Sequence, residues 1–255
     1  MPLEKSRPQY RQIADVLRDE IERGDIAPGS TLPAEPELAA RFSATRPTVN
    51  RALAVLSTEG LIRTHRGRGT QVRRIPVIHR TAMARYDRKA RERNGAHGAF
   101  DTEIRSLGME PRTETEVALA TPPDAVAEAL GLAKDEQSAI MRKRRMQADN
   151  VPVQLATSWI PAEIATGTQL AEVDSGPGGI ISRFRELGYE QVRLTESVRL
   201  RRSTDEEQEF LGLEDDQPVV EIWHTGWTKD DRAVEVCIHA VPAYLWVLHY
   251  DWPLT

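Results

Sequence analysis

Residues 8–60 contain three short amphipathic segments separated by turns, and this pattern constrains the fold more than any other feature of the chain. The first segment, residues 8–24, has apolar side chains at the i, i+3 and i+4 spacing of one buried helix face. These side chains are Tyr10, Ile13, Val16, Leu17 and Ile21. Residues 25–33 are rich in turn formers, and Pro33 prevents the helix from continuing. We therefore expect one helix that ends at Gly24, because glycine is a common C-terminal cap.

A second and a third helix are expected after this turn. The second runs over about residues 34–42, and the third starts near Arg46 and ends at Gly60. Thr45 is the expected N-cap of the third helix, and Pro47 suits its first turn. The side chains expected to be buried are Leu38, Ala39, Phe42, Val49, Leu53, Val55 and Leu56. Two short helices joined by a tight turn, the second with polar and basic side chains at its start, predict a helix-turn-helix.

Two short strands and a basic turn follow the third helix. The strands are expected over residues 61–64 and 70–72. The turn between them consists of His65, Arg66, Gly67, Arg68 and Gly69. Gly67 allows the backbone to approach another molecule closely, because it has no side chain. Residues 1–74 therefore predict a mostly helical winged helix-turn-helix domain with a small β wing.

The start of the third helix carries the side chains that a helix in the major groove presents to bases. They are Arg46, Thr48, Asn50 and Arg51. Arg46 can donate two hydrogen bonds to a guanine edge, Asn50 can pair with adenine, and Thr48 suits a phosphate or a thymine methyl group. We expect these four residues and the wing turn to bind DNA. The alternative is a solvated charged face, and it is strongest for Arg51.

These residues resemble the winged helix of the GntR family of bacterial regulators. The matching motifs are Pro8-x-Tyr10-x-Gln12-Ile13, Pro28-Gly29, Leu32-Pro33, Glu37-Leu38-Ala39, Arg46-x-Thr48-Val49, Ala52-Leu53, Glu59-Gly60-Leu61-Ile62 and Gly67-x-Gly69-Thr70. The resemblance implies DNA contacts at Arg46, Thr48 and Asn50 and an approach of the wing tip to the minor groove. The pair Asn50-Arg51 is similar to the HutC-type members. Pro36 stands where many relatives have an arginine that touches DNA, so the operator preference is expected to differ from theirs.

Charge is unevenly distributed along the chain, which supports contact with nucleic acid at one end only. The whole sequence has a net charge of −5, but residues 1–98 carry +8 and residues 99–255 carry −13. Residues 75–99 are basic and weakly apolar, and we interpret them as a linker. A helix over residues 80–93 is the alternative. Basic side chains in either form can add phosphate contacts.

Residues 100–255 alternate between strand-like and short helical segments. Strand pairs are expected over residues 139–147 with 151–160 and over 218–228 with 234–241, a single strand over 192–201, a last strand within 244–252, and helices over 122–130, 179–188 and 204–211. The first pair is joined by a turn around Asp149-Asn150. Mostly antiparallel strands with a few helices predict an α+β domain.

This part resembles the UTRA effector-binding domain of HutC-type GntR regulators, which shares its fold with chorismate lyase. The residues that carry the resemblance are Arg144, Ala148-Asp149, Pro152-Val153, Ser158-Trp159-Ile160-Pro161, Leu187-Gly188, Ser203-Thr204-Asp205-Glu206-Glu207, Leu211-Gly212-Leu213, Pro218-Val219 and Ala233-Val234-Glu235-Val236. The resemblance implies a homodimer with a site for an organic acid, an amino acid or a sugar derivative in each domain.

Four residues are candidates for the effector site. Arg144 matches a pocket arginine that can bind a carboxylate with two hydrogen bonds, and its alternative is an ion pair with a neighbouring acid. Glu235 matches a pocket glutamate that can accept from a ligand amine or hydroxyl, and its alternative is a surface position. Gly179 stands where sugar-phosphate-binding relatives have a serine. Trp159 can stack on a ligand, or pack in the core, which is the more common role of a strand tryptophan. Those relatives have a second arginine and a glutamate that this chain lacks at the matching positions, which argues against a phosphorylated sugar.

We expect a cytoplasmic, sequence-specific regulator, a repressor whose homodimer binds double-stranded operator DNA and responds to a small-molecule effector. The alternative is a ligand-independent repressor, or a plasmid-maintenance or transfer regulator, whose C-terminal domain only dimerises. No enzyme activity is expected, because His224, Cys237 and His239 have no recognisable catalytic spacing. No cofactor, metal or membrane contact is expected either, because the chain has a single cysteine and no apolar run of about 18 residues.

Overall fold

The computed structural model describes residues 7–65, 69–81, 98–215 and 217–251. The chain divides into two compact units, Met1–Val77 and Ile78–Thr255. We call them the first unit and the second unit.

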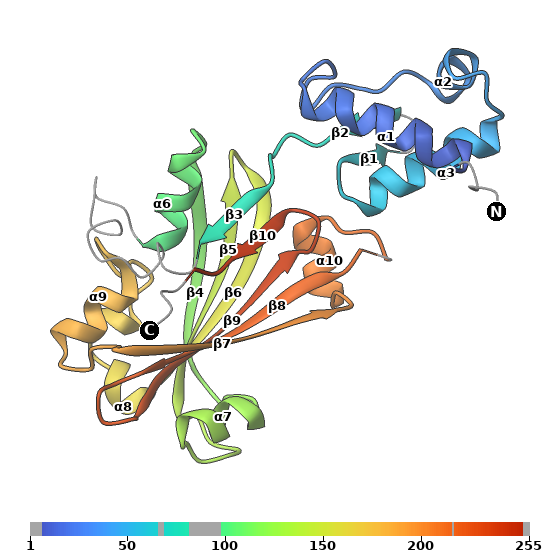
Figure 1. The fold of residues 1–255 in the computed structure, drawn as a ribbon. Coiled ribbons are helices and arrows are strands. Elements are labelled where there is room, and N and C mark those ends of the chain that lie inside the picture. Colours follow the sequence, from blue (N-terminus) through green and yellow to red (C-terminus); the bar gives the residue numbers. More distant parts are fainter. Residues whose placement is uncertain (1–6, 66–68, 82–97, 216, 252–255) are drawn as a thin grey trace. The chain divides into compact units, whose positions relative to one another are not determined.

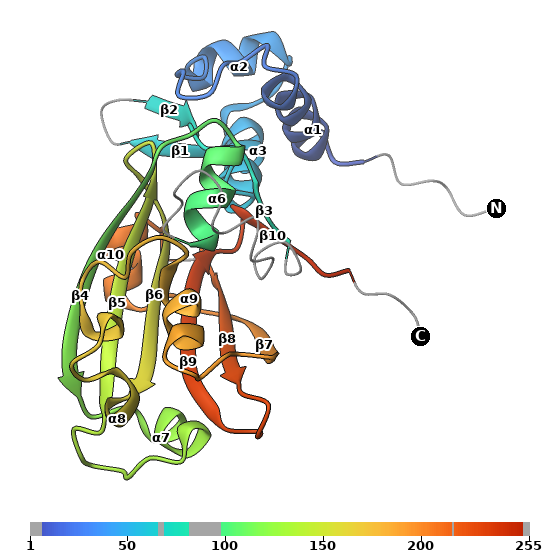
Figure 2. The same ribbon diagram turned by 90° about the vertical axis from the view of Figure 1, so that its left-hand side faces the viewer.

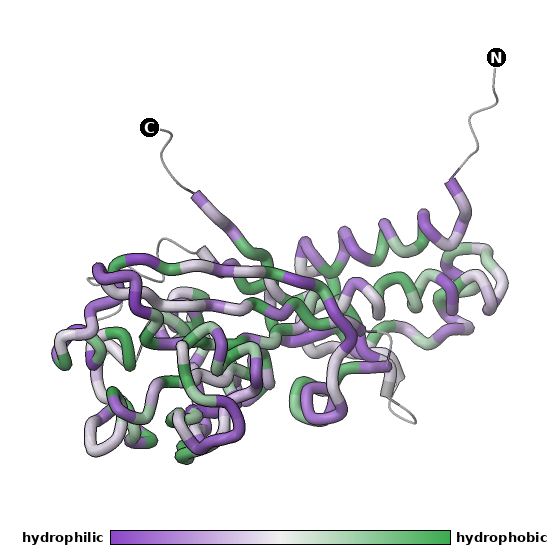
Figure 3. The backbone as a smooth tube through the Cα atoms, turned by 90° about the horizontal axis from the view of Figure 1, so that it is seen from below, coloured by the Kyte–Doolittle hydropathy of each residue, from purple (hydrophilic) through white to green (hydrophobic). Residues whose placement is uncertain are grey.

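The first unit has the three helices and two strands that the sequence predicts. They are α1 (Gln9–Glu22), α2 (Glu35–Arg41), α3 (Arg46–Thr58), β1 (Ile62–His65) and β2 (Gly69–Val72). Hydrophobic and hydrophilic residues alternate along the helix that follows the N-terminus (Figure 3), and its inward side buries Ile13, Ala14 and Leu17. β1 pairs with β2 in antiparallel register. The helix-turn-helix with a small wing is therefore confirmed.

Local signals set the ends of these elements. The side chain of Thr45 accepts a hydrogen bond from the backbone nitrogen of Thr48, so Thr45 is the N-cap of α3 as predicted. The buried core of the unit joins all three helices to the wing, and consists of Ile13, Ala14, Leu17, Leu32, Leu38, Val49, Ala52, Leu53, Leu56, Ile62 and Val72. Ala39, Phe42 and Val55, which were expected in the core, are partly buried and pack against it.

A six-stranded sheet is the centre of the second unit (Figures 1 and 2). Its order is β4-β5-β6-β9-β8-β7, and all its neighbouring pairs are antiparallel. The strands are β4 (Pro111–Ala120), β5 (Ala139–Ala148), β6 (Val151–Pro161), β7 (Arg193–Arg201), β8 (Val219–Trp227) and β9 (Ala233–Pro242). Both predicted strand pairs are present. β4 was not predicted.

Helices cover both faces of this sheet. In Figure 2, α6 (Ala99–Ser106), α8 (Ala162–Ala165) and α9 (Gly179–Glu186) lie in front of the sheet, and α10 (Asp205–Leu211) lies behind it. The apolar cluster under α8 and α9 includes Ile160, Leu170 and Phe184. A separate cluster joins α7 (Asp124–Leu130) to the strands and includes Val126 and Trp159. The domain is therefore α+β, as predicted.

A small parallel sheet joins the beginning and the end of the second unit. β3 (Ile78–Thr81) pairs with β10 (Trp246–His249), and the Ile78 backbone donates a hydrogen bond of 2.8 Å to the Leu245 carbonyl. This differs from the interpretation of residues 75–99 as a linker, because Arg80 lies in a strand and is only 2% exposed. A helix starting at Arg80 is wrong for the same reason. Residues 82–97, where the rest of that helix was considered, lie outside the described residues.

Candidate functional site

The first unit presents polar side chains at the start of α3. Arg46 and Asn50, one helical turn apart, are both exposed. The only ion pair that the described residues offer Arg46 is with Glu35, at 3.6 Å between Nη2 and Oε2. A pair this exposed is weak, so it leaves the guanidinium available to another partner.

The other two α3 candidates have partners within the unit. The Thr48 hydroxyl oxygen lies 2.9 Å from that of Thr45, so it takes part in the cap of the helix. The guanidinium carbon of Arg51 lies 4.4 Å from the centre of the Tyr10 ring on α1. This cation–π contact directs Arg51 towards α1.

The wing tip is described only in part. His65 ends β1 and pairs in register with Gly69, which begins β2. Arg66, Gly67 and Arg68 and the side chain of His65 lie outside the described part of the structure. The expectation that these four residues bind DNA therefore stays a prediction.

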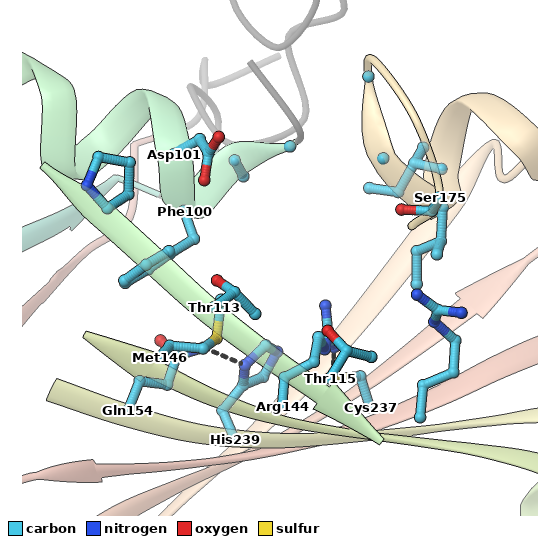
Figure 4. Close-up of a pocket in the computed structure, with 18 of the residues that line it drawn as sticks. Phe100, Asp101, Thr113, Thr115, Arg144, Met146, Gln154, Ser175, Cys237 and His239 are labelled. Carbon is cyan, nitrogen blue, oxygen red and sulfur yellow. Dashed lines mark hydrogen bonds between the residues drawn. The ribbon is translucent and has the colours of Figure 1, made fainter. Parts of the chain in front are cut away.

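The second unit contains a cavity of about 390 Å³ on the face of the sheet that α6 and α9 cover (Figure 4). Its floor consists of alternate residues of neighbouring strands, because successive side chains of a strand point to opposite faces. The floor residues are Thr113 and Thr115 of β4, Arg142, Arg144 and Met146 of β5, Gln154 of β6, His224 of β8, and Glu235, Cys237 and His239 of β9. Figure 4 shows Phe100 and Asp101 of α6 on one side and Ser175 of the loop before α9 on the other.

Arg142 lies under the cavity and holds one of its walls. It is 2% exposed, and its guanidinium donates hydrogen bonds to the carbonyls of Leu170, Glu172 and Val173. Burial, together with the neighbouring charge of Arg144, lowers the pKa of Arg142 to about 10. Its terminal nitrogens are thus occupied by the loop that leads to α9, and the residue supports the cavity wall.

Arg144 has more hydrogen-bonding capacity left for a bound molecule than Arg142 has. Its Nη2 donates to the Ser158 hydroxyl at 2.7 Å and to the Cys237 sulfur at 3.2 Å. Its Nε is buried and has no hydrogen-bond partner among the described residues. No carboxylate within ion-pair distance of Arg144 is found in the part of the chain that the structure describes, so the alternative of a neighbouring acid is not supported there.

Glu235 is held in place from two sides. Its Oε1 accepts from the Ser158 hydroxyl at 2.8 Å, and its Oε2 accepts from Nε2 of Gln191 at 3.0 Å. It is 3% exposed, so the alternative of a surface position is wrong. Gly226, opposite Glu235 on β8, gives Gln191 its room, because a Cβ on Gly226 would lie 2.5 Å from the Gln191 amide.

Three of the four effector candidates line this cavity: Arg144, Gly179 and Glu235. Trp159 does not. It points to the opposite face of the sheet, since its neighbour Ser158 contacts the floor residues, and it packs in the cluster with Val126 of α7. The assignment of Trp159 to the effector site is therefore corrected to the core.

Several cavity residues were missed from the sequence. Arg142 is two positions before Arg144 on the same strand, so alternation alone places both on one face. Gln154 and His239 come from different strands and lie 3.1 Å apart between Nε2 and Nδ1. Only the strand order β5-β6-β9 brings them together, and no local pattern predicts that order.

Neither a metal site nor a membrane span was found in the described parts of the chain. No group of three or more His, Cys, Asp or Glu side chains there is arranged to hold a metal ion. None of the helices among those residues is both long and apolar enough to cross a membrane.

Comparisons with known proteins agree with this architecture. The model for bacterial regulatory proteins of the gntR family matches residues 9–72, and the UTRA domain model matches residues 106–244. An uncharacterised HTH-type transcriptional regulator of Streptomyces coelicolor is 34% identical over 255 residues, covering 96% of this chain and 94% of that protein. The HTH-type transcriptional repressor NagR of Bacillus subtilis is 27% identical, covering 93% of this chain and 90% of NagR.

Solved structures show the same fold. A crystal structure of a GntR-family transcriptional regulator matches with a TM-score of 0.60 at 25% identity, covering 98% of this chain and 99% of that one. PhnF from Mycobacterium smegmatis matches with a TM-score of 0.59 at 21% identity, covering 95% and 100%.

A winged helix joined to a sheet domain with an internal cavity defines a DNA-binding transcription regulator whose activity a ligand modulates. The chain belongs to the GntR family and carries the UTRA domain of its HutC-type members. The family and these relatives are transcriptional regulators and not enzymes.

Proposed function

We propose that this regulator is a cytoplasmic repressor that binds a palindromic operator as a homodimer and is controlled by a small molecule with an anionic group. Repression is supported by relatives named as repressors, NagR of Bacillus subtilis and the mannosyl-D-glycerate transport/metabolism system repressor MngR of Escherichia coli. A two-fold symmetric dimer suits a palindrome, because each winged helix then meets an equivalent half-site.

In the first unit, Arg46 and Asn50 are the proposed base-reading residues. Both are exposed at the start of α3, and Arg46 is engaged only by its long, exposed pair with Glu35 among the described residues. Thr48 and Arg51 have partners within the unit, so their proposed contacts are to the DNA backbone, together with the wing residues His65, Arg66, Gly67 and Arg68.

In the second unit, the observation that supports an anionic effector is the guanidinium of Arg144 on the cavity floor, which is only partly buried. It bonds to the Ser158 hydroxyl and the Cys237 sulfur, and no carboxylate pairs with it among the described residues. A carboxylate that accepts from this guanidinium would gain a charge-assisted hydrogen bond. Gly179 begins α9 at the cavity wall, where the partial positive charge of a helix N-terminus also favours an anion. Glu235 supplies negative charge on the same floor, so a second, cationic or hydroxyl group on the effector fits. An amino acid or hydroxy acid meets both requirements.

Thermal unfolding of the full chain with a panel of amino acids, organic acids and sugar phosphates tests the effector site. A ligand at 100 times its Kd stabilises the native state by about 2.7 kcal/mol. Arg144→Ala is expected to abolish the shift. Arg145→Ala is the matched control, because Arg145 is the adjacent residue of β5, exposed, and bound to Glu206 instead. An equal shift in Arg144→Ala would contradict the site. The absence of any shift over a broad panel would favour the ligand-independent repressor.

Titration of operator DNA with the same proteins tests the DNA site. Arg46→Ala is expected to weaken specific binding by about 1–3 kcal/mol, the usual loss for a bidentate guanine contact. Arg23→Ala is the control, because Arg23 is an exposed cation of the same unit paired with Asp25 after α1. Equal operator affinity of the wild type and Arg46→Ala would refute the assignment of the recognition helix.

A further inference from the structure

A buried group of polar side chains connects the cavity to the strand that follows the first unit. Glu196 on β7 is paired in register with His224 on β8, and Nδ1 of His224 lies 3.5 Å from Oε1 of Glu196. The same carboxylate binds both terminal nitrogens of Arg80 on β3, with 2.9 Å between Nη1 and Oε2. His224 itself lines the cavity.

Glu196 also reaches the second strand of the small parallel sheet. The hydroxyl of Tyr250, just after β10, donates to Oε2 of Glu196 at 2.9 Å. Because β10 is the hydrogen-bonded partner of β3, one carboxylate holds both strands against the main sheet. Residues 73–77 alone separate β2 of the first unit from β3. The restraint on β3 is thus a restraint on the segment that carries the DNA-binding unit.

This group is sensitive to its surroundings because it is buried. Arg80 is 2% exposed and Glu196 is 9% exposed. Burial opposes ionisation of Glu196, but hydrogen bonds from His224 and Arg80 outweigh it and hold the pKa of Glu196 well below its usual range. A buried ion pair depends strongly on each of its partners, since removing one leaves an uncompensated charge in a low dielectric. A change at His224 therefore acts on the Arg80 pair with little screening by solvent.

We propose that Glu196 transmits the occupancy of the cavity to β3. An occupant that hydrogen-bonds to His224 changes the contact of His224 with Glu196, and this changes how firmly Glu196 holds Arg80 and Tyr250. The restraint on the chain between the two units then changes, and with it the operator affinity. The proposal rests on the proposed function, because it takes the cavity as the effector site and the first unit as the operator-binding part.

A purely stabilising role for Glu196 is the competing explanation, and Glu221 provides the comparison. Glu221 is also a buried carboxylate, it lies on β8 next to β7, and it accepts hydrogen bonds of 2.6 Å from Arg199 and Arg201. It neither lines the cavity nor contacts β3 among the described residues. Glu221→Gln therefore removes a comparable buried charge without touching the proposed connection.

The single cysteine allows the cavity to be filled without knowing the effector. Cys237 lies on the cavity floor, 3.2 Å from Nη2 of Arg144. Reaction of the full chain with 2-sulfonatoethyl methanethiosulfonate forms a disulfide at Cys237 and releases methanesulfinate, which leaves a tethered sulfonate in the cavity. Intact mass measures the extent of labelling, and Cys237→Ser treated with the same reagent controls for other effects. The two readouts are amide hydrogen exchange of residues 78–81 and the operator Kd.

In the wild type and in Glu221→Gln, labelling is expected to change both the exchange rate of β3 and the operator Kd by at least about fivefold, the lower end of typical allosteric coupling. In Glu196→Gln, labelling is expected to change neither. His224→Gln is a second variant that serves if Glu196→Gln does not fold. In His224→Gln, too, labelling is expected to change neither the β3 exchange rate nor the operator Kd. His239→Gln is its control, because His239 lines the same cavity but bonds to Gln154.

Each other result has a distinct meaning. A labelled wild type with unchanged β3 exchange would overturn the proposal, as would a response of Glu196→Gln and His224→Gln equal to that of the wild type. If the operator Kd responds while β3 does not, the connection is refuted and the proposed function stands. If β3 responds in the wild type but not in Glu196→Gln, while the operator Kd stays constant, the connection stands and its role in operator control fails.

Discussion

Replacement of Gly226 by alanine tests whether the cavity floor depends on one missing side chain. The Cβ of alanine would lie 2.5 Å from both Cδ and Nε2 of Gln191, so the Gln191 side chain has to move. The backbone at Gly226 is not in the left-handed region, so alanine meets no strain from φ. Without the clash, alanine in a strand would even be favoured over glycine by about 0.5–1 kcal/mol.

The magnitude follows from what Gln191 does. Its Nε2 donates a 3.0 Å hydrogen bond to Oε2 of Glu235, which is 3% exposed. Losing a hydrogen bond to a buried charged group costs about 2–3 kcal/mol, so the net loss in Gly226→Ala is about 1–2.5 kcal/mol after the gain from alanine. For a domain of this size each kcal/mol lowers Tm by about 2–4 °C, which predicts a decrease of about 2–10 °C.

Thermal unfolding of a double-mutant cycle measures this effect. The cycle compares the wild type, Gly226→Ala, Gln191→Ala and the double variant, and isolates the interaction between the two positions. In the Gln191→Ala background the clash is absent, so Gly226→Ala is expected to be neutral or slightly stabilising. An equal loss of stability in both backgrounds would refute the explanation based on Gln191.

Three further predictions concern other parts of the chain. Thr45→Ala removes the N-cap of α3 and is expected to cost the first unit about 1 kcal/mol in thermal unfolding, whereas Thr45→Ser is expected to retain the cap; equal stability of the two variants would contradict this. Burial opposes ionisation of Glu207, but hydrogen bonds from Arg201 outweigh it and lower the pKa of Glu207. The stability that the ionised Glu207 carboxylate supplies is therefore present at neutral pH and is lost as the pH falls below the ordinary carboxyl pKa of about 4.3. Glu207→Gln is expected to flatten the acid side of a plot of Tm against pH. An unchanged acid slope would contradict this role of Glu207. Leu200 on the edge strand β7 is 66% exposed. If a second copy covers this strand in the proposed homodimer, Leu200→Glu is expected to lower the mass measured by light scattering towards that of a monomer, and an unchanged mass would contradict an interface at β7.

Elements with a strong local signal could be predicted from the sequence. The third helix has a cap, a proline in its first turn and periodic apolar residues, and it begins at Arg46 as predicted. The turn between β5 and β6 was expected around Asp149-Asn150, and both residues have positive φ, of 47° and 62°. Asparagine and aspartate tolerate this conformation better than other residues with a side chain, so the two residue types alone indicate the position of the turn.

Elements that depend on distant pairing could not be predicted. β4 is an edge strand with polar residues on both faces of its first half, because Thr113 and Thr115 face the cavity, so it lacks the apolar alternation of the central strands. β3 was interpreted as part of a linker because its stabilising partners, β10 and Glu196, come much later in the chain. The role of Trp159 could not be predicted for a similar reason. An apolar strand residue fits a core or a ligand site equally well until the helix that covers its face of the sheet, here α7, is known.

The pairing of β3 with β10 also has a consequence for synthesis. Chains are made from the N-terminus, and N-terminal domains generally fold first. The first unit, Met1–Val77, is complete long before Trp246–His249 and Tyr250 leave the ribosome. Until then β3 has neither its partner strand nor the Tyr250 hydroxyl. A chain that stops shortly before residue 246 would therefore keep a folded winged helix, but its β3 would lack both the pairing with β10 and the contact through Tyr250. A late nonsense mutation is thus expected to affect the control of operator binding more than the recognition of the operator.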